Sequence, residues 1–360
     1  MTNAQITGML FVILTSCHPE VKKIANNLSA DVLMVNVDSS VNPSEDFFAY
    51  ANGKWIKGNP IPAEESSWGL PNLVLNENLN RLKVINENAV KSNAAQGSST
   101  QKIADFWITA MDSIQIENVG IKPLQSYFDK INSISDIPSF LNVAAILSTI
   151  GVSALFHDMV EQDEKNSERI SFHVWQGGIG LPDREYYFKS DSSTLHIKSE
   201  YVKHISRFLV LQGQDSVSAS ASANGILALE TKLAEASKKR EDLRDPDSNY
   251  NKLSLPEMKK LNEVLRWKEY LARIGISKID SVIVGQPAFL KRLDQVIKTT
   301  AINDWKNYLR YRLLSSFEEA LPEAYSTEAF NFHRVMSGAK QRKPRWREQS
   351  RRKSPRWVSC

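Results

Sequence analysis

The feature that most constrains the fold is the stretch from Asn42 to Gly69, where a helix start, an apolar face and a proline stop follow one another. Asn42 can cap a helix, Pro43 suits the first helical position, and Glu45 can return a bond to the cap. Apolar side chains then recur every four residues, at Phe47, Ala51 and Trp55. Gly58, Pro60 and Pro62 end the helix. The stretch therefore predicts an amphipathic helix followed by a proline-rich turn.

Helical periodicity continues along most of the chain. Asn72–Val90 is expected to turn one face inward, formed by Leu75, Leu79, Leu82 and Ile85, and Gln101–Met111 does the same with Ile103, Phe106, Trp107 and Ala110. Asp136 caps a helix that reaches about Ile150. Further helices are expected at Leu195–Leu211, Ala219–Lys239, Pro256–Asn262, Trp267–Ile274, Pro287–Lys298, Ile302–Leu321 and Thr327–Val335. The fold class is therefore predicted to be mainly α.

One region changes to a period of two and predicts a small β-hairpin. Apolar residues alternate in 152–156 and again in 170–174, and the polar residues Gln162 to Ser167 lie between them. A short strand is expected at Ser281–Val284.

A glycine-rich loop follows the hairpin, with the sequence W-Q-G-G-I-G-L-P-D-R-E-Y-Y from Trp175 to Tyr187. Glycines permit positive φ angles and close backbone approach, and a proline fixes the exit. A phosphate-binding loop is the competing interpretation, but the stretch lacks both the G-x-G-x-x-G spacing and a following G-K-[ST]. The candidate site residues in this loop are Gly178, Gly180, Leu181, Pro182, Asp183, Arg184, Tyr186 and Tyr187.

Several of these stretches together resemble the neprilysin family of zinc metallopeptidases. The matching motifs are D-F-F-x-Y-x-x-G-x-W-I, N-P-I-P and S-x-W-G near the start, then G-x-G-L-P-D-R-x-Y-Y, then R-D-P-x-x-x-Y-N around Asp245 and Tyr250. The resemblance covers about residues 42–347. It implies two helical lobes that enclose a chamber for short peptides, with residues 71–347 as the N-terminal lid domain and residues 42–70 as a segment of the catalytic lobe. Phe47, Phe48 and Trp55 are then expected to lack their natural cover.

The resemblance also implies a zinc site that this sequence does not contain. Family members bind zinc with H-E-x-x-H and a downstream glutamate. The six histidines are His18, His157, His173, His196, His204 and His333, and none is followed by Glu. His196 and His204 are eight residues apart, which is too far for two ligands of one ion without help, and His157 with Glu161 is typical of a local ion pair. We therefore expect no catalytic residue, no bound zinc and no activity from the chain alone, although the full-length family uses zinc.

The beginning of the chain predicts an export signal. Ile6–Leu14 is a short apolar run, and Leu14-Thr15-Ser16-Cys17 resembles a bacterial lipobox, so residues 1–17 are interpreted as a signal with Cys17 as the lipidation site. Met1–Gln5 has no Lys or Arg, which leaves a misassigned start site or a buried strand as alternatives. Residues 18–41 are expected to be a linker. Animal members of the family are disulfide-bonded, whereas the two cysteines here, Cys17 and Cys360, provide no disulfide framework. The expected location is therefore a bacterial cell envelope, lipid-anchored or periplasmic.

The end of the chain carries the positive charge. Lys340 to Arg356 holds nine Lys or Arg and one acid, so the net charge of +4 leaves the rest of the chain at −4 and argues against a nucleic-acid partner. Residues 348–360 are interpreted as an aberrant basic tail from a shifted or prematurely ended reading frame. A genuine basic tail that binds anionic lipid or nucleic acid is the alternative.

These observations lead to one main hypothesis and two alternatives. The chain is predicted to be the N-terminal part of a neprilysin-like zinc metalloendopeptidase that hydrolyses short peptides, truncated before the zinc-binding half. The alternatives are a lipid-anchored, non-enzymatic peptide-binding module, and a half that assembles in trans with a separately encoded catalytic half.

Overall fold

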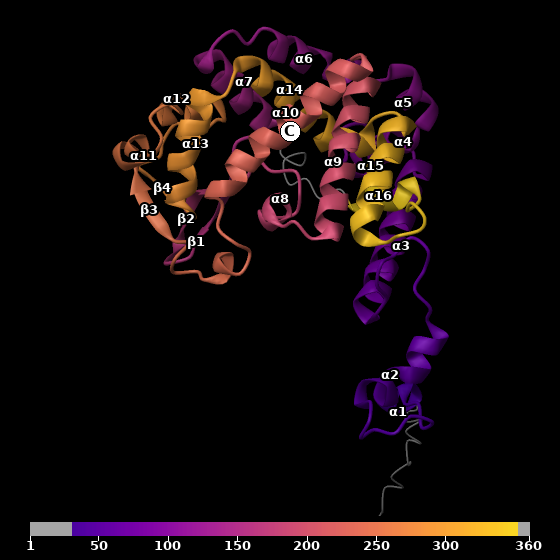
Figure 1. Ribbon diagram of the computed structural model, residues 1–360. Helices are drawn as coiled ribbons and strands as arrows, with labels where there is room; N and C mark the ends of the chain where they lie inside the picture. The colour runs from indigo at the N-terminus through magenta and orange to yellow at the C-terminus, as the bar shows by residue number, and fades with distance from the viewer. Residues whose placement is uncertain (1–30, 352–360) are drawn as a thin grey trace, which may run out of the picture. The chain divides into compact units, whose positions relative to one another are not determined.

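The computed structural model describes residues 31–351, which divide into two units at Ile61/Pro62. The predicted signal with Cys17 and residues 352–360 of the predicted tail lie outside the described residues. Between residues 31 and 351, no helix is both long and apolar enough to cross a membrane. Figure 1 labels the helices and strands of both units.

The described part of the first unit consists of α1 (Val32–Asn36) and α2 (Phe47–Gly58). Residues 31–41 were predicted to be a linker, but they form α1 and a turn fixed to α2. Asp38 is 6% exposed, its backbone N–H donates to Tyr50 O at 2.7 Å, and its side chain accepts from Lys57 Nζ at 2.6 Å. Lys57 holds the pKa of Asp38 at about 2. Only a glycine fits opposite this residue, since a Cβ on Gly53 would lie 2.6 Å from Asp38 Cβ.

The predicted start of α2 is wrong by about one turn. Asn42 accepts hydrogen bonds from Ser44 within a turn, and the helix begins at Phe47 with Asp46 as the N-cap. Asp46 Oδ1 accepts from Ala49 N at 2.8 Å. The end at Gly58 agrees with the prediction. Phe47 and Phe48 are 69% and 68% exposed, whereas Trp55, which was expected to be uncovered with them, is half-buried.

The second unit is mainly helical with one small sheet, which confirms the predicted fold class. Its helices are α3 (Leu70–Lys91), α4 (Ser99–Met111), α5 (Ser113–Val119), α6 (Gln125–Asn132), α7 (Ile137–Thr149), α8 (Glu185–Phe188), α9 (Ser192–Leu211), α10 (Ser216–Ala236), α11 (Leu255–Leu261), α12 (Trp267–Arg273), α13 (Pro287–Thr299), α14 (Ile302–Phe317), α15 (Glu323–Ser337) and α16 (Arg345–Arg351). Three 3₁₀ turns, η1 (Lys122–Leu124), η2 (Asp242–Arg244) and η3 (Glu318–Ala320), connect some of them. In Figure 1, α10 and α14 lie between the sheet with α11–α13 on one side and α9, α15 and α16 on the other.

The predicted β-hairpin is part of a four-stranded sheet. Its order is β1 (His157–Asp163), β2 (Asn166–Trp175), β4 (Ser281–Val284), β3 (Asn251–Ser254); β2 and β4 are parallel and the other pairs antiparallel. The hairpin and β4 were predicted. The first strand was predicted at residues 152–156, which is too early. The apolar residues of that segment are buried in the core, and β1 begins only after them. β3 was not predicted.

Asp163 ties the hairpin turn to β3. Its side chain is fully buried and accepts from Lys252 Nζ at 2.7 Å and from the Tyr250 hydroxyl at 2.9 Å. The tyrosine of the R-D-P-x-x-x-Y-N motif is thus engaged through its hydroxyl with the hairpin turn. The hydrogen bond from Lys252 is the main reason why the pKa of Asp163 lies well below its usual range, and the hydrogen bond from Tyr250 lowers this pKa further.

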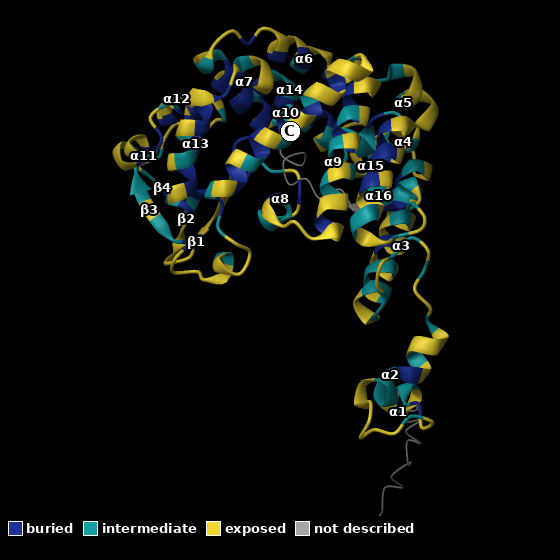
Figure 2. Ribbon diagram, in the orientation of Figure 1, coloured by how far each residue is buried: buried dark blue, intermediate teal, exposed yellow. Residues whose placement is uncertain are grey.

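The helices α3 and α4 are confirmed, but their buried faces differ from the predicted ones. Leu79 and Trp107 are buried as expected, whereas Leu82, Ile85 and Phe106 are exposed. Figure 2 shows half-buried and exposed residues along most of α3. Periodicity identified the helices but not which side of each would be covered.

The two ends of the second unit are joined by backbone and ionic bonds. The Ala63 carbonyl accepts from the N–H groups of Lys340 and Gln341 at 2.8 and 3.0 Å. Arg347, 7% exposed, donates to Glu64 and Glu65 at 3.3 and 3.0 Å. Residues 62–69 thus belong to the helical unit, so the observed division lies earlier than the predicted one at residue 70.

The helix α16 also crosses the predicted start of the tail at residue 348. Gln349 is 4% exposed, and its side-chain amide donates to Glu319 O at 3.1 Å. The residues up to Arg351 are thus part of the folded unit.

We predict that Asp163→Asn destabilises the chain in a pH-dependent way. Because the folded pKa of Asp163 lies below the ordinary value of about 3.9, its stabilising effect is present above that pH and is lost as the pH falls toward the folded pKa. Urea unfolding should give the variant a clearly lower free energy of unfolding than the parent at pH 6. The difference between the two proteins should be smaller at pH 3. Asp129→Asn, which changes an exposed carboxylate on α6, is the control. An equal loss at both pH values would contradict the prediction.

Candidate functional site

The candidate site is the loop between β2 and α8, which occupies the junction of α8, α9, α10 and α14. The loop starts against the residues before β1. A Cβ on Gly177 would lie 2.9 Å from His157 N, and Gly178 has a φ of +77° and lies against the Ala154 carbonyl. Both positions therefore require glycine, for space at the first and for φ and space at the second.

The Tyr187 hydroxyl holds the middle of the loop. It accepts from the N–H groups of Gly180 and Leu181, each at 3.1 Å, and it donates to Glu230 Oε2 at 2.7 Å. Tyr201 on α9 donates to the same carboxylate at 3.0 Å. One buried carboxylate thus joins α8, α9 and α10, and through Tyr187 it reaches the backbone of the loop.

The loop carbonyls are bonded from α14. The Tyr308 hydroxyl lies 2.7 Å from Gly178 O and 2.5 Å from Ala154 O, and its single proton serves one of them at a time. Arg312 donates through Nη1 to Ile179 O at 3.2 Å and through Nη2 to Ser153 O at 3.0 Å.

The backbone of residues 178–181 therefore has two N–H groups and two carbonyls bonded to protein side chains. This geometry excludes the competing phosphate-binding interpretation, because such a loop needs free N–H groups that point at the ligand.

Burial controls the electrostatics of this junction. Glu230 is 0% exposed, and burial raises the pKa of its carboxyl while the positive charge of Arg312 opposes the shift. Burial and the neighbouring carboxylate raise the pKa values of Tyr187 and Tyr201 well above the usual range. Both phenols therefore stay protonated and act as hydrogen-bond donors.

The predicted site residues divide by exposure. Gly178, Leu181 and Tyr187 are buried, Asp183, Arg184 and Tyr186 are half-buried, and Gly180 and Pro182 are exposed.

The side chains of the last turn of the loop are also engaged. Asp183 Oδ1 accepts from Glu185 N at 2.8 Å, and Arg184 donates to Ala234 O at 3.2 Å and lies over the Phe188 ring. These contacts fix how the loop enters α8.

Sequence reasoning missed Glu230, Tyr201, Tyr308 and Arg312. A signal for Glu230 was present, because it lies on the apolar face of α10 with Ile226, Leu229 and Leu233, where a charged residue is out of place. Tyr201 and Tyr308 carried no such signal, since aromatic residues are ordinary on a buried helix face. Arg312 is a charged residue between the buried Tyr311 and Leu313, which is a signal of the same kind as that of Glu230.

The described histidines do not form a metal site. Across residues 31–351, no group of three or more His, Cys, Asp or Glu side chains is arranged to hold a metal ion. His204 is buried, stacks on Phe332 and lies 3.4 Å from Glu328, whereas His196 is exposed. His204 is therefore explained by packing.

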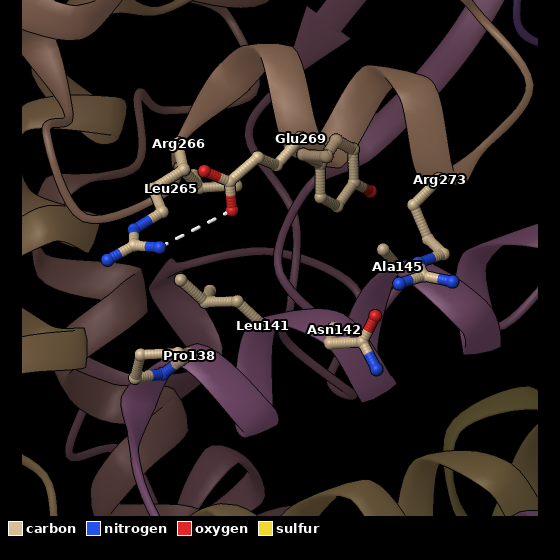
Figure 3. Close-up of a pocket in the computed structure, with 9 residues that line it drawn as sticks. Pro138, Leu141, Asn142, Ala145, Leu265, Arg266, Glu269 and Arg273 are labelled. Atoms are coloured by element: carbon tan, nitrogen blue, oxygen red, sulfur yellow. Dashed lines mark hydrogen bonds and ion pairs between the residues drawn. The ribbon is translucent and has the colours of Figure 1, made fainter.

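A separate small pocket of about 90 Å³ lies between α7 and α12 (Figure 3). Leu141, Ala145 and Leu265 are its buried apolar lining, and the exposed pair Arg266–Glu269, 3.5 Å apart, lies at its edge. Its lining includes none of the predicted site residues.

Comparison with known proteins shows which family this chain is similar to. A family model described as peptidase family M13 matches residues 43–352. Endothelin-converting enzyme 1 of Cavia porcellus is 27% identical over 328 residues, which cover 88% of this chain and 43% of that protein. Neprilysin-3 of Drosophila melanogaster is 25% identical over 336 residues, with coverages of 88% and 42%.

The structural comparison agrees. The crystal structure of the Mycobacterium tuberculosis zinc metalloprotease Zmp1 in complex with an inhibitor is similar with a TM-score of 0.83 and 28% sequence identity, covering 88% of this chain and 48% of that one. The fold is thus that of the helical N-terminal domain of a zinc metallopeptidase. The chain belongs to peptidase family M13, which confirms the resemblance to the neprilysin family, and it spans less than half the length of the relatives it matches.

We predict that Gly180→Ala destabilises the chain by about 1–3 kcal/mol, because a new Cβ would lie 2.8 Å from Tyr201 Cζ and the buried ring cannot move away. Gly225→Ala on α10 is the matched control. Its new Cβ meets only Asp304 Oδ1 at 3.8 Å, so a gain of about 0.5–1 kcal/mol is expected from helix propensity. Urea unfolding measures both. Equal stability of Gly180→Ala and the parent would show that the approach to Tyr201 is not restrictive.

Proposed function

We propose that this chain is the lid part of a zinc metalloendopeptidase that hydrolyses short peptides, and that it does not hydrolyse peptides by itself. The main support is the family match over residues 43–352, together with the similarity to 48% of an inhibitor-bound zinc metalloprotease. The endothelin-converting and neprilysin-type relatives point to peptides as substrates.

The residues of this chain do not fit zinc. The sequence has no H-E-x-x-H, which supplies two ligands and the general base at such sites. Among residues 31–351, no set of His, Cys, Asp or Glu side chains gathers into a possible metal site. We therefore assign the zinc and the hydrolytic step to a catalytic half, and no step of the reaction to this chain.

The contribution of this chain would be a wall of the peptide chamber. The loop from Gly178 to Tyr187 is the candidate, because its backbone is bonded inward while Pro182 is exposed and Asp183, Arg184 and Tyr186 are partly exposed. A rigid wall limits the orientations of a bound peptide, which is one way that a residue outside the reacting centre supports catalysis.

Two alternatives keep specific support. A lipid-anchored peptide-binding module is favoured by the lipobox-like Leu14–Cys17, which would place the chain in a bacterial cell envelope. Assembly in trans with a separate catalytic half is favoured by the coverage, since the matched relatives are more than twice as long as the matched part. The DNA downstream of the codon for Arg347, read in all three frames, separates them: an H-E-x-x-H sequence supports a broken or split peptidase, and its absence supports the binding module.

We predict that the purified chain binds no stoichiometric zinc and cleaves no fluorogenic peptide. Zinc content by mass spectrometry and EDTA-sensitive peptide hydrolysis are the measurements. If a catalytic half is found downstream, its addition should restore cleavage. One equivalent of zinc together with EDTA-sensitive cleavage by this chain alone would overturn the proposal.

For the anchored state, we predict that Cys17 carries lipid. Expression of the full chain in a bacterium with labelled palmitate should label the protein and place it in the membrane fraction. Cys17→Ser should abolish the label, whereas Ser16→Ala should retain it. Equal labelling of parent and Cys17→Ser would remove the anchor from the proposal.

A further inference from the structure

The deepest charged group of the candidate site touches no solvent and carries out no chemistry that the proposed function requires. Glu230 is 0% exposed, and each of its two oxygens accepts hydrogen bonds from phenol hydroxyls. Burying a carboxylate is costly unless hydrogen bonds and a compensating charge replace water. A leucine at this position of an apolar helix face would avoid that cost, so the carboxylate calls for a specific explanation.

The hydrogen bonds indicate that the carboxylate orients Tyr187. A phenol oxygen has one proton and two lone pairs. When Tyr187 donates to Glu230 Oε2, its lone pairs are directed to the N–H groups of Gly180 and Leu181, both at 3.1 Å. Without an acceptor at Glu230, the hydroxyl proton would be free to rotate toward those same N–H groups and repel them.

The neighbouring side chains restrict the loop backbone to few conformations. Arg312 supplies the positive charge near Glu230 and holds the Ile179 carbonyl at 3.2 Å. The Tyr201 ring lies so close to Gly180 that a single added carbon would clash. The Tyr201 ring and the Tyr187 hydroxyl therefore restrain the loop at Gly180 and Leu181. Tyr308 and Arg312 restrain it at the carbonyls of Gly178 and Ile179.

We infer that Glu230 is a positioning residue of the proposed peptide chamber: through the Tyr187 hydroxyl it holds the Gly180–Leu181 backbone in one conformation, so that the loop presents a fixed surface to a peptide. The inference rests on the proposed function only for its last clause, since the anchoring itself is a property of this chain.

The test is amide hydrogen exchange of the full chain, resolved to single residues, with urea unfolding measured in parallel. In Tyr187→Phe, the amides of Gly180 and Leu181 should exchange at least about tenfold faster than in the parent, because each loses its acceptor. In Glu230→Gln, the same two amides should exchange faster by a smaller factor, since the amide nitrogen cannot accept from a phenol.

Tyr325→Phe is the matched control. Tyr325 on α15 is 2% exposed and its buried hydroxyl has no hydrogen-bond partner among the described residues, so its removal tests the effect of losing a buried phenol oxygen alone. Exchange at Gly180 and Leu181 should stay within about twofold of the parent. If Tyr187→Phe does not fold, Glu230→Gln carries the test, with faster exchange at the same two amides as the expected result, because Tyr187 then lacks the carboxylate that orients its proton.

Two results would overturn the inference. One is a general loss of stability in Tyr187→Phe with no selective change at the two amides, which would mean that the ring only fills space. The other is an equal change in Tyr325→Phe. Neither depends on peptide binding, so a chain that keeps its protected loop but fails to form a peptidase with any catalytic half would contradict the proposed function and leave the anchoring role intact.

Discussion

The cost of burying the Glu230 carboxylate is the constraint on which the second unit is organised. An ion of this kind loses several kcal/mol of hydration even after relaxation, so partners have to be in place when the chain folds. The partners come from separate helices: Tyr187 from α8, Tyr201 from α9 and the positive charge of Arg312 from α14. Displacing α8 or α9 leaves the carboxylate or a phenol unpaired, so this one carboxylate fixes two helices relative to α10, while Arg312 adds a favourable charge from α14.

The same principle operates at two other places in the second unit. Asp163 is completely buried and paired with Lys252, which joins the tip of the hairpin to a strand far along the chain. Arg347 is paired with Glu64 and Glu65, which joins the beginning and the end of the described helical unit. Apolar packing alone tolerates small shifts between elements, whereas a buried charge does not, because its partner has to lie within about 3 Å.

The sequence was sufficient for most of the longer helices and insufficient for these pairs. Capping residues and periodicity predicted most helices, because a cap such as Asp136 and a four-residue repeat are local signals. The first strand was misplaced because residues 152–156 alternate by chance within a segment in which all but Ser153 are buried. On α3, the covered side includes Lys83, whose ammonium lies over the Trp346 ring of α16, and no local pattern predicts that a lysine faces inward. Glu230 was visible as a charge on an apolar stripe, but its partners lie 29, 43 and 82 residues away in the chain.

These features bear on the role that we propose for the loop from Gly178 to Tyr187. A glycine-rich loop has more conformations to lose than other loops, so holding it in one of them requires bonds that are not available to it locally. Here the bonds come from side chains of α8 and α14, and the carboxylate of α10 fixes the direction of one of them. These bonds are made to protein side chains of α8 and α14, and they leave the side chains of Pro182 to Tyr186 wholly or partly exposed. The outer side, from Pro182 to Tyr186, is thereby given a defined shape, and a defined shape is what the proposed role as a wall of a peptide chamber requires.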